Sequence, residues 1–446
     1  MKFKLASHLL KILILVSLVV IIVGKAFFTN SPNMFLLIYG ITVTSVIFLT
    51  FSISLRYKDP SIKIREKDLT RGIEKPLISC ILAVKNDEKI IARCIDSLIN
   101  SDYENKEIIV VNDASTDKTK EILKNYNNLH GITIINLNKN IGKKRAISEG
   151  LRIAKGEIFV FTDSDCVVAS DAISRIIEIF MIDKKVGAVS GHGRALNSPE
   201  NILTKIQDSW YETQYSVKKA FESVFGSVSC VSGPLAVYRR SAIYNYIPAW
   251  ESDTFLGDEF RFATDRQLTG YVLGGKYIGE KLKKEYKYSD FVMNENYPTR
   301  DWKVLYCKSA KVWTIVPNTL KKLIWQNIRW KKSFIRSLFF TGTFYWRKKV
   351  IPATRYYLGA LFVLLGPFIA LRHLIYLPLR GNILAGFYYL GGILIIGALY
   401  GFMYKLDNPK SDLWMYRPLM SIFSTLVLSW LIFYSAFTIK NMVWHR

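Results

Sequence analysis

The sequence predicts an α/β domain with a mostly parallel sheet, combined with hydrophobic helices that enter or cross a membrane. Two observations predict this fold class. Between residues 77 and 162, short apolar runs typical of buried strands alternate with stretches of helical periodicity. On both sides of this more polar region lie apolar runs close to the roughly 20 residues that a bilayer requires.

The chain is unusually hydrophobic: half of the 446 residues are hydrophobic, and the mean hydropathy is +0.15. A soluble domain of this length is normally more polar. The first two apolar runs cover residues 9–23 and 35–55. A cleaved signal peptide is the alternative for the first run, since the chain starts with a basic segment, but no small-residue cleavage site follows. We therefore expect an N-terminal transmembrane hairpin over residues 1–57.

The net charge is +25, from 61 basic and 36 acidic residues. A nucleic-acid binder would share this charge, so its position along the chain decides between the two. Basic residues gather beside the apolar runs, at Arg56, Lys58, Lys63, Arg65, Arg329, Lys331, Lys332, Arg336, Arg347, Lys348, Lys349 and Arg355. This distribution predicts that the chain from about residue 56 to 355 is cytosolic and faces anionic membrane lipids. Nucleic acid is not an expected partner.

The five cysteines lie at spacings that match no metal site: Cys80, Cys94, Cys166, Cys230 and Cys307. In a cytosolic domain we expect them to be reduced and structural.

Strand and helix patterns alternate at the start of the polar region. Strands are expected at 77–84, 107–111, 133–137 and 158–162, with helices at 90–100, 118–126 and 146–154. Such alternation predicts a mostly parallel sheet with helices on both faces. Ligands of these sheets lie beyond the carboxyl ends of the strands, so polar residues there are the candidate site.

Helices dominate the rest of the chain. They are expected at 202–222 and 318–338, and the second is basic and amphipathic, which suits a membrane interface. Three apolar runs follow at 356–377, 383–403 and 419–439. Three complete spans would place the C-terminus outside the cell. We therefore expect the last run, which follows Pro418 and is only modestly hydrophobic, to be re-entrant or interfacial.

Asp113 follows the second expected strand, within Val110-Val-Asn-Asp-Ala-Ser-Thr-Asp117. An acidic side chain at this position can accept hydrogen bonds from a base N–H or a ribose hydroxyl. The alternative is that Asp113 and Ser115 cap the next helix, and the motif alone favours this capping role.

Two carboxylates at alternate positions end the fourth expected strand, in Phe159-Val-Phe-Thr-Asp163-Ser-Asp165. Such a pair can hold a hard divalent cation that bridges phosphate oxygens. A polar loop gives Asp-x-Asp by chance, but rarely after a fully apolar strand with Asp113 upstream. We expect Asp165 to bind the metal.

With these motifs, the chain resembles the family 2 glycosyltransferases of the GT-A fold, in particular the hyaluronan synthases, over nearly its whole length. The resemblance implies a Rossmann-like cytosolic GT-A domain at 58–317, interface helices at 318–355 and a C-terminal transmembrane or re-entrant region at 356–446. It also implies a multi-pass protein of the plasma membrane. The implied ligands are UDP-GlcNAc and UDP-GlcA as donors, nascent polysaccharide as acceptor and Mg²⁺ or Mn²⁺ on Asp165, with Asp113 and Asp163 at the donor nucleotide.

Two further motifs resemble the parts of these enzymes that bind substrate. Asn140-Ile-Gly-Lys143-Lys-Arg is similar to their Gly-Lys-Arg stretch and implies Lys143 at the donor diphosphate; a solvated basic turn is the alternative. Ser232-Gly233-Pro234-Leu matches the family motif that lines the acceptor sugar site, where a tight turn is also expected.

The segment Ala263-Thr264-Asp265-Arg-Gln-Leu-Thr resembles the family's Gly-Asp-Asp-Arg-x-Leu-Thr and implies Asp265 as the general base. The chain departs from the pattern at two positions, with Ala263 in place of Gly and Thr264 in place of an acid. Asp258 and Glu259 lie shortly upstream and are the alternative bases.

Gln326-Asn-Ile-Arg329-Trp330 is the Gln-x-x-Arg-Trp motif of processive members, and on a helix its three named residues share one face. Arginine can bond two diphosphate oxygens at once, and tryptophan offers a flat face to a sugar ring. An interfacial Trp-Arg helix is the alternative. The end of the chain, Trp444-His-Arg446, resembles the tail that carries Trp-Gly-Thr-Arg and implies that both named residues cover the nucleotide; an unrelated basic end is the alternative.

These parts predict an inverting, processive synthase that extends and exports hyaluronan, with a chitin-like N-acetylglucosamine polymer as the alternative product. A single-addition transferase acting on a lipid carrier fits the Gln-x-x-Arg-Trp motif less well. A non-catalytic basic scaffold predicts scattered carboxylates, whereas Asp113, Asp165 and Asp265 occur where a donor site requires them.

Overall fold

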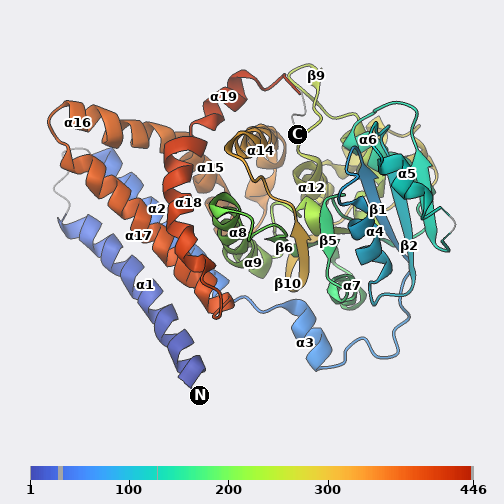
Figure 1. Cartoon of the computed structure of the whole chain (residues 1–446), viewed down its shortest axis with the longest axis horizontal. Helices are drawn as coiled ribbons and strands as arrows, with labels where there is room; N and C mark the ends of the chain where they lie inside the picture. Colours follow the sequence, from blue (N-terminus) through green and yellow to red (C-terminus); the bar gives the residue numbers. More distant parts are fainter. Residues whose placement is uncertain (1, 29–33, 128, 443–446) are drawn as a thin grey trace.

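The computed structural model describes residues 2–28, 34–127 and 129–442. Hydrophobic helices occupy one side of the molecule and an α/β domain the other, with α14 (Leu320–Phe340) between them (Figure 1). The position of the site depends on the order and direction of the strands in this domain.

One eight-stranded sheet forms the centre of the α/β domain, in the order β3-β2-β1-β4-β7-β6-β10-β5. The strands are β1 (Ile78–Val84), β2 (Lys106–Asn112), β3 (Ile132–Asn136), β4 (Ile158–Phe161), β5 (Cys166–Val168), β6 (Val186–Ala195), β7 (Ala236–Arg239) and β10 (Lys303–Thr314). Strands β3, β2, β1 and β4 are parallel neighbours, as are β6 and β10. Strand β7 is antiparallel to β4 and β6, and β5 is antiparallel to β10. The sheet is thus mixed: the predicted parallel direction holds except at β7 and β5.

Helices cover both faces of this sheet, as predicted. They include α4 (Ile91–Ile99), α5 (Thr119–Lys124), α6 (Lys143–Ile153) and α7 (Ala172–Ile182). Ile81 belongs to the core cluster that contains α6, whereas Cys80 and Leu82 belong to the cluster that contains α4 and α7. Successive residues of β1 are therefore buried on opposite faces, which explains why this strand is apolar throughout. Full burial of one such aliphatic side chain contributes about 1.5–3 kcal/mol.

All five cysteines are free, and all but the partly buried Cys230 are buried in the core. This agrees with the expectation that the cysteines are reduced and structural.

The predicted helix at 202–222 is continuous but not uniform. Helix α8 (Ile202–Thr213) passes into the π-helical segment η1 (Gln214–Lys219) and then into α9 (Ala220–Val224). Asn201 and Thr204 form a capping box at its start, which satisfies two backbone N–H groups that the helix leaves free.

Four helical stretches among the described residues are long and apolar enough to cross a membrane. They are Ser7–Ala26 within α1 (Lys2–Phe28), α2 (Met34–Ser54), Val350–Leu379 starting with α15 (Val350–Leu371), and α17 (Leu384–Asp407). A fifth stretch, Leu413–Leu428 with Leu431–Phe437, is bent by 41° and fits a broken span or a re-entrant loop equally. The re-entrant assignment of this run stays a prediction.

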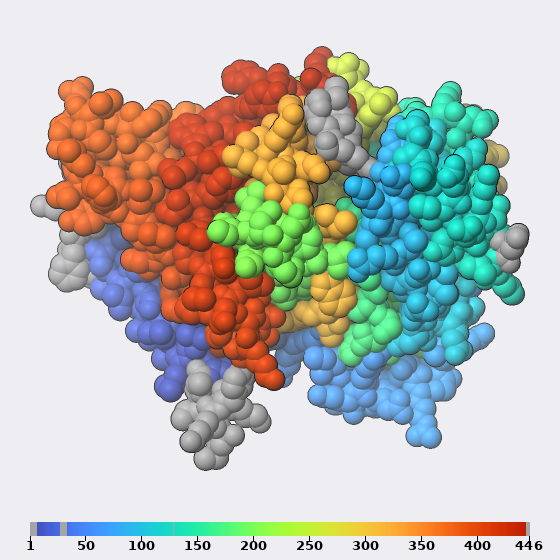
Figure 2. Space-filling model, in the orientation of Figure 1, coloured from blue at the N-terminus to red at the C-terminus, as the bar shows by residue number. Residues whose placement is uncertain are grey.

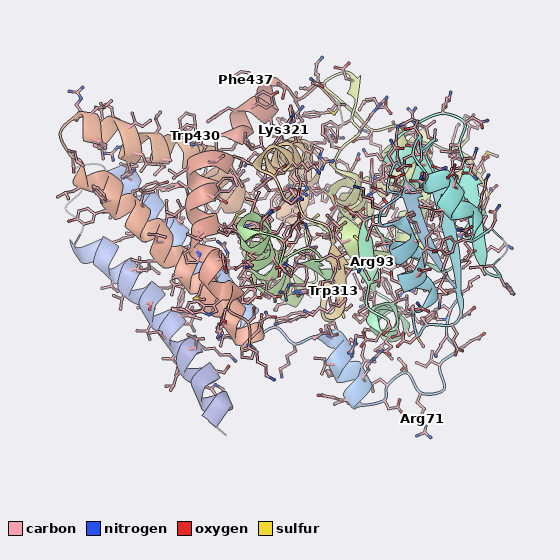
Figure 3. All side chains as sticks on the ribbon, viewed as in Figure 1. Arg71, Arg93, Trp313, Lys321, Trp430 and Phe437 are labelled. Carbon is pink, nitrogen blue, oxygen red and sulfur yellow. The ribbon has the colours of Figure 1, made fainter. Side chains whose placement is uncertain are left out.

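The C-terminal part of the bent stretch returns to the α/β domain, where α19 (Leu431–Phe437) packs against α14. Lys321 near the start of α14 and Phe437 at the end of α19 lie on the same side of the molecule (Figure 3). The chain end is thereby brought toward the interface helix.

Arg194 on β6 joins the α/β domain to α17, one of the helices that could cross a membrane. Its guanidinium pairs with Asp208 and Glu212 of α8 and donates hydrogen bonds to the Tyr404 hydroxyl at 3.1 Å and to Asn408 Oδ1 at 3.2 Å. A largely buried guanidinium is tolerated only when such partners are present. These contacts fix the end of α17 against the sheet.

Candidate active site

A cavity of about 1110 Å³ lies at the carboxyl edge of the sheet. Every predicted site residue that the structure describes lines it: Asp113, Lys143, Asp163, Asp165, Ser232, Gly233, Pro234, Asp265, Gln326, Arg329 and Trp330. Trp444 and Arg446 lie outside the described residues. Motifs spread over more than 200 positions of the sequence thus meet in one space.

The sheet order explains this location. Strand β1 lies between β2 and β4, so consecutive connections leave it in opposite directions and open a crevice at its carboxyl end. Asp87 follows β1, Asp113 follows β2, and Asp163 and Asp165 follow β4. All four carboxylates line the cavity.

Asp113 is buried and braces the loop before α6. Its Oδ1 accepts a hydrogen bond from the backbone N–H of Ile141 at 2.7 Å, and its Oδ2 accepts one from Gly142 at 3.1 Å. Gly142 has φ +88°, a conformation that favours glycine, and α6 begins immediately after it. Helix α5 receives no side-chain cap, so the alternative in which Asp113 and Ser115 cap the next helix is wrong.

Lys143 is the first residue of α6 and pairs with Asp163 across the cavity. Its side chain is partly buried, so the alternative of a solvated basic turn is wrong. Burial lowers the pKa of Lys143, but the negative charges of Asp163, Asp165 and Asp265 outweigh this effect and the net pKa is raised. Lys143 therefore remains charged at the edge of the carboxylate group.

Asp163, Asp165 and Cys166 place one ligand atom each within 4.8 Å of one another. Burial raises the pKa of Asp165 to about 6, and the charges of Asp163 and Asp87 act in the same direction. Burial also holds the pKa of the Cys166 thiol well above its ordinary value, so this group stays protonated and is a poor ligand. Two carboxylates with excess negative charge suit a hard divalent cation such as Mg²⁺ or Mn²⁺.

The Ser232-Gly233-Pro234 turn touches these carboxylates directly. A Cβ atom on Gly233 would lie 2.7 Å from Asp163 Oδ2, so only glycine permits this approach. The turn is fixed by Thr162, whose hydroxyl donates to the Pro234 carbonyl at 2.8 Å, and by Lys219, which donates to Ser232 Oγ at 2.5 Å. The metal-binding candidates and the expected acceptor turn are therefore contiguous.

Asp265 lies in the first turn of α12 (Thr264–Glu285), with its carboxylate at the cavity wall. Oδ1 accepts a hydrogen bond from the Arg266 backbone N–H at 2.9 Å, and Oδ2 accepts one from the Cys230 thiol at 3.4 Å. The alternative bases lie elsewhere. Asp258 pairs with Lys440, and Glu259, on the small hairpin β8–β9 (Thr254–Phe255, Asp258–Glu259), pairs with Arg145 of α6 and with Arg261. Neither lines the cavity.

Gln326, Arg329 and Trp330 all face the cavity from α14, as their helical spacing predicts. The Trp330 ring stacks on Trp210 of α8 at a centroid distance of 5.8 Å, and Figure 2 shows α8 in green directly beside α14 in light orange. Gln326 Oε1 is buried and has no hydrogen-bond partner among the described residues. A purely interfacial role would not require this inward-facing arrangement.

Comparison with known proteins identifies the domain. Residues 79–247 match the family model described as Glycosyl transferase family 2. The chain carries a family 2 glycosyltransferase domain.

Along its whole length, the chain is similar to a hyaluronan synthase of Streptococcus pyogenes, with 24% identity over 449 residues, 99% of this chain and 97% of the relative. A poly-beta-1,6-N-acetyl-D-glucosamine synthase of Staphylococcus epidermidis is 29% identical over 253 residues, 57% of this chain and 53% of the relative. Among solved structures, a mannosyltransferase from Pyrobaculum calidifontis in complex with GDP-Man and Mn²⁺ has a TM-score of 0.46 and 18% identity, covering 86% of this chain and 97% of that one. The chain is a membrane-associated glycosyltransferase of the GT-A fold.

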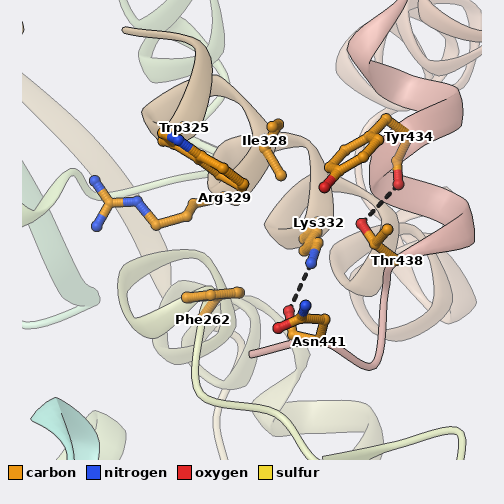
Figure 4. Close-up of a pocket in the computed structure, with 8 residues that line it drawn as sticks. All are labelled: Phe262, Trp325, Ile328, Arg329, Lys332, Tyr434, Thr438 and Asn441. Carbon is orange, nitrogen blue, oxygen red and sulfur yellow. Dashed lines mark hydrogen bonds between the residues drawn. The ribbon is translucent and has the colours of Figure 1, made fainter. Parts of the chain in front are cut away.

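The C-terminal segment reaches the glycosyltransferase cavity. It encloses a small pocket against α14, lined by Phe262, Trp325, Ile328, Arg329, Lys332, Tyr434, Thr438 and Asn441 (Figure 4). Lys332 Nζ donates a hydrogen bond to the Asn441 carbonyl at 2.6 Å, and Met442, the last described residue, lines the large cavity itself.

Sequence reasoning missed several residues of the glycosyltransferase cavity. Asp87 could have been found by the rule that located Asp113, because it too follows a strand of the parallel group. Trp210, Lys218 and Lys219 carry no strand-end signal, since they lie on one long helical stretch. Their spacing matches an ordinary amphipathic helix, and only tertiary packing brings them to the cavity.

Proposed function

We propose that this chain is a processive, inverting glycosyltransferase that polymerises hyaluronan from UDP-GlcNAc and UDP-GlcA and passes the polymer across the plasma membrane. One observation carries the proposal: the carboxylates after β1, β2 and β4, the acceptor turn, Asp265 and the Gln326–Trp330 motif share one cavity. The family 2 domain supports nucleotide-sugar donors, and similarity to a hyaluronan synthase along the whole chain supports these two. The clusters of basic residues beside the spans support a cytosolic domain.

Donor binding is assigned to the side of the cavity that carries Lys143 and Arg329. Asp113 orients the loop before Lys143, and Gln326 offers its unpartnered carbonyl oxygen to the nucleotide. Asp165, with Asp163, would hold Mg²⁺ or Mn²⁺, which when bound supplies positive charge to the leaving diphosphate. When the donor enters, we expect Lys143 to exchange Asp163 for a phosphate oxygen.

Transfer follows from the position of Asp265. Its carboxylate accepts the proton of the acceptor hydroxyl while that oxygen attacks the anomeric carbon of the donor sugar. The bond from this carbon to the diphosphate oxygen breaks on the opposite face, which inverts the configuration. Arg329 stabilises the departing charge through its planar fork, and Trp330 holds the acceptor ring against its face. No covalent intermediate on the enzyme is required.

A polymer of N-acetylglucosamine alone is the second candidate. The relative that synthesises poly-beta-1,6-N-acetyl-D-glucosamine is 29% identical within the matched region, against 24% for the hyaluronan synthase along the whole chain. The two products differ in the donors that they require, so the donor requirement separates them.

The experiment is incubation of purified protein in lipid nanodiscs with each UDP-sugar alone and with both together. We expect polymer only with both donors, and complete digestion of that polymer by hyaluronidase. Polymer from UDP-GlcNAc alone would replace hyaluronan with the second candidate. Absence of sugar transfer from any nucleotide donor would contradict the polymerase function itself.

A further inference from the structure

Lys218, Lys219 and Arg266 line the cavity, and the mechanism above gives them no role. Lys219 is buried and donates hydrogen bonds to Ser190 Oγ at 2.8 Å and Ser232 Oγ at 2.5 Å, both neutral groups. For the side chains of Lys218 and Arg266, the described residues provide no hydrogen bond. None of the three cations forms an ion pair with a carboxylate of the described chain.

Two nearby carboxylates, Glu222 and Asp265, balance only part of the charge of these three cations. Both oxygens of Glu222 accept hydrogen bonds from Ser229, one from its backbone N–H at 2.9 Å and one from its hydroxyl at 2.8 Å. Asp265 is the proposed proton acceptor and is within electrostatic reach of Lys219 and Arg266. Burial lowers the pKa of Lys218 and of Lys219 to about 8, and the charge of Arg266 acts in the same direction on both. The cluster is therefore short of negative charge and would gain from an anionic ligand.

The backbone brings two consecutive lysines to the cavity. Lys218 and Lys219 end the π-helical segment η1, whose other cavity-lining members are Gln214 and Tyr215. A π-helical turn inserts one extra residue and widens the helix locally, and such turns occur frequently at functional sites. The local irregularity therefore falls where the helix meets the cavity, which supports a ligand-binding role for this segment.

The position of the cluster indicates which ligand it meets. Lys143 and Arg329 lie on the donor side, whereas Lys219 is bonded to Ser232 of the acceptor turn and Arg266 follows Asp265. An anion bound here belongs to the acceptor. The anionic group of a sugar acceptor is the carboxylate of a uronic acid, and a guanidinium with two ammonium groups suits a carboxylate.

We propose that Lys218, Lys219 and Arg266 form a carboxylate subsite for a uronic acid at the growing end of the acceptor, and so set specificity when N-acetylglucosamine is added. This inference rests on the proposed function, since it concerns the acceptor of the same reaction. It goes further by assigning recognition of the acidic sugar to Lys218 and Lys219, which lie outside the family motifs, together with Arg266 of the Asp-Arg-x-Leu-Thr segment.

The test compares two acceptor oligosaccharides that differ only in their terminal sugar, glucuronate or glucose, so that the carboxylate is the single variable. Wild-type enzyme should transfer N-acetylglucosamine to the glucuronate-ended acceptor with a kcat/KM at least about tenfold higher, the scale of one charge-assisted contact. Lys218→Met should remove this preference by lowering kcat/KM for the glucuronate-ended acceptor alone. Lys218→Arg should retain the preference.

Lys120→Met is the matched control, because Lys120 is an exposed lysine on α5 and outside the cavity. UDP binding by calorimetry verifies that each variant is folded. The assignment is overturned if wild-type enzyme uses both acceptors equally, or if Lys218→Met weakens both to the same degree. Preferential use of a polyprenyl-phosphate-linked sugar that depends on Lys218 would overturn it too, since the anion would then be a phosphate.

A binding measurement separates this inference from the proposed function. Calorimetry of the glucuronate-ended oligosaccharide with UDP-bound enzyme requires no transfer. If polymer forms but the oligosaccharide shows no Lys218-dependent binding, the subsite is overturned and the polymerase function stands. If it binds through Lys218 but neither UDP-sugar is transferred, the subsite stands and the proposed function fails.

Discussion

Replacement of Asp265 by asparagine tests the chemistry most directly, because it removes the proposed proton acceptor with almost no change of shape. Asparagine can keep the hydrogen bond that Oδ1 accepts from the Arg266 backbone N–H at 2.9 Å. Of the two hydrogen bonds, the substitution weakens the one that Oδ2 accepts from the Cys230 thiol at 3.4 Å, and a thiol is a weak donor. We therefore expect the free energy of unfolding to change by less than about 1 kcal/mol.

The expected catalytic effect is much larger. A positioned general base contributes about 10²–10⁴-fold to the rate, which corresponds to about 3–5 kcal/mol of transition-state stabilisation at about 1.4 kcal/mol per factor of ten. Since the proton moves only in the transition state, the decrease should fall on kcat and leave UDP affinity nearly unchanged. Because the expected change in the free energy of unfolding is small and the expected decrease in kcat is large, the variant tests proton transfer separately from folding.

The assay is polymer formation from both UDP-sugars, with UDP binding measured by calorimetry on the same preparations. Asp258→Asn is the matched control, because Asp258 is an exposed carboxylate outside the cavity, paired with Lys440. It should keep near wild-type turnover. If Asp265→Asn kept more than about a tenth of wild-type turnover, a far smaller decrease than removal of a positioned base should cause, Asp265 would not be the base and Asp258 and Glu259 would need testing in its place.

Three further predictions follow from the same geometry. Chelation of divalent metals, or Asp165→Ala, should abolish polymer formation; activity that survives either treatment removes the metal from the mechanism. Asp253→Asn should lower the free energy of unfolding by about 3 kcal/mol, measured with denaturant, since buried Lys144 and Arg336 share its carboxylate; an unchanged midpoint would show that their charges are satisfied elsewhere. Ala263→Gly should raise the thermal midpoint in detergent, corresponding to about 1 kcal/mol, because Ala263 has φ +60°; a lower midpoint would contradict strain at this residue.

The strands and helices of the first half of the α/β domain were predictable because their signals are local. Strand β1 is apolar on both faces, and α4 and α6 have regular helical periodicity, so each is visible in a short window of sequence. Strands β5, β6, β7 and β10 were not predicted. Their partners in the sheet are distant in sequence, and β5 and β7 have only three and four residues, respectively. Pairing with distant strands determines such short elements, and no local pattern records it.

The same distinction applies to the site. The type of residue at a strand end predicted that Asp113 and the Asp163–Asp165 pair lie at the carboxyl edge of the sheet, where the structure places them. The bonding of Asp113 was not predictable, because its partners, Ile141 and Gly142, are 28 and 29 positions away and donate through the backbone. The pairing of Lys143 with Asp163 likewise depends on how α6 packs beside β4. Sequence therefore indicates which groups take part, while the fold decides which of them meet.

The last prediction concerns the end of the chain. Whether the bent helical stretch crosses the membrane completely decides on which side of the membrane the tail lies. Met442 lines the large cavity, and Lys332 of α14 donates a hydrogen bond to the Asn441 carbonyl at 2.6 Å. We expect Trp444 and Arg446, which lie outside the described residues, to cover the donor nucleotide on the cytosolic side. Deletion of residues 444–446 should lower polymer synthesis at least about tenfold, the scale of one charge-assisted hydrogen bond to phosphate, with membrane insertion unchanged.

In otherwise cysteine-free protein, a cysteine at position 445 should also be shielded from a membrane-impermeant thiol reagent in intact cells. This result requires that the bent stretch does not cross the membrane completely, because four spans already return the chain to the side on which it started. Full activity after the deletion would assign the tail to membrane anchoring. Labelling of position 445 from outside would show that the bent stretch is a complete fifth span, and would leave the tail with no access to a cytosolic nucleotide.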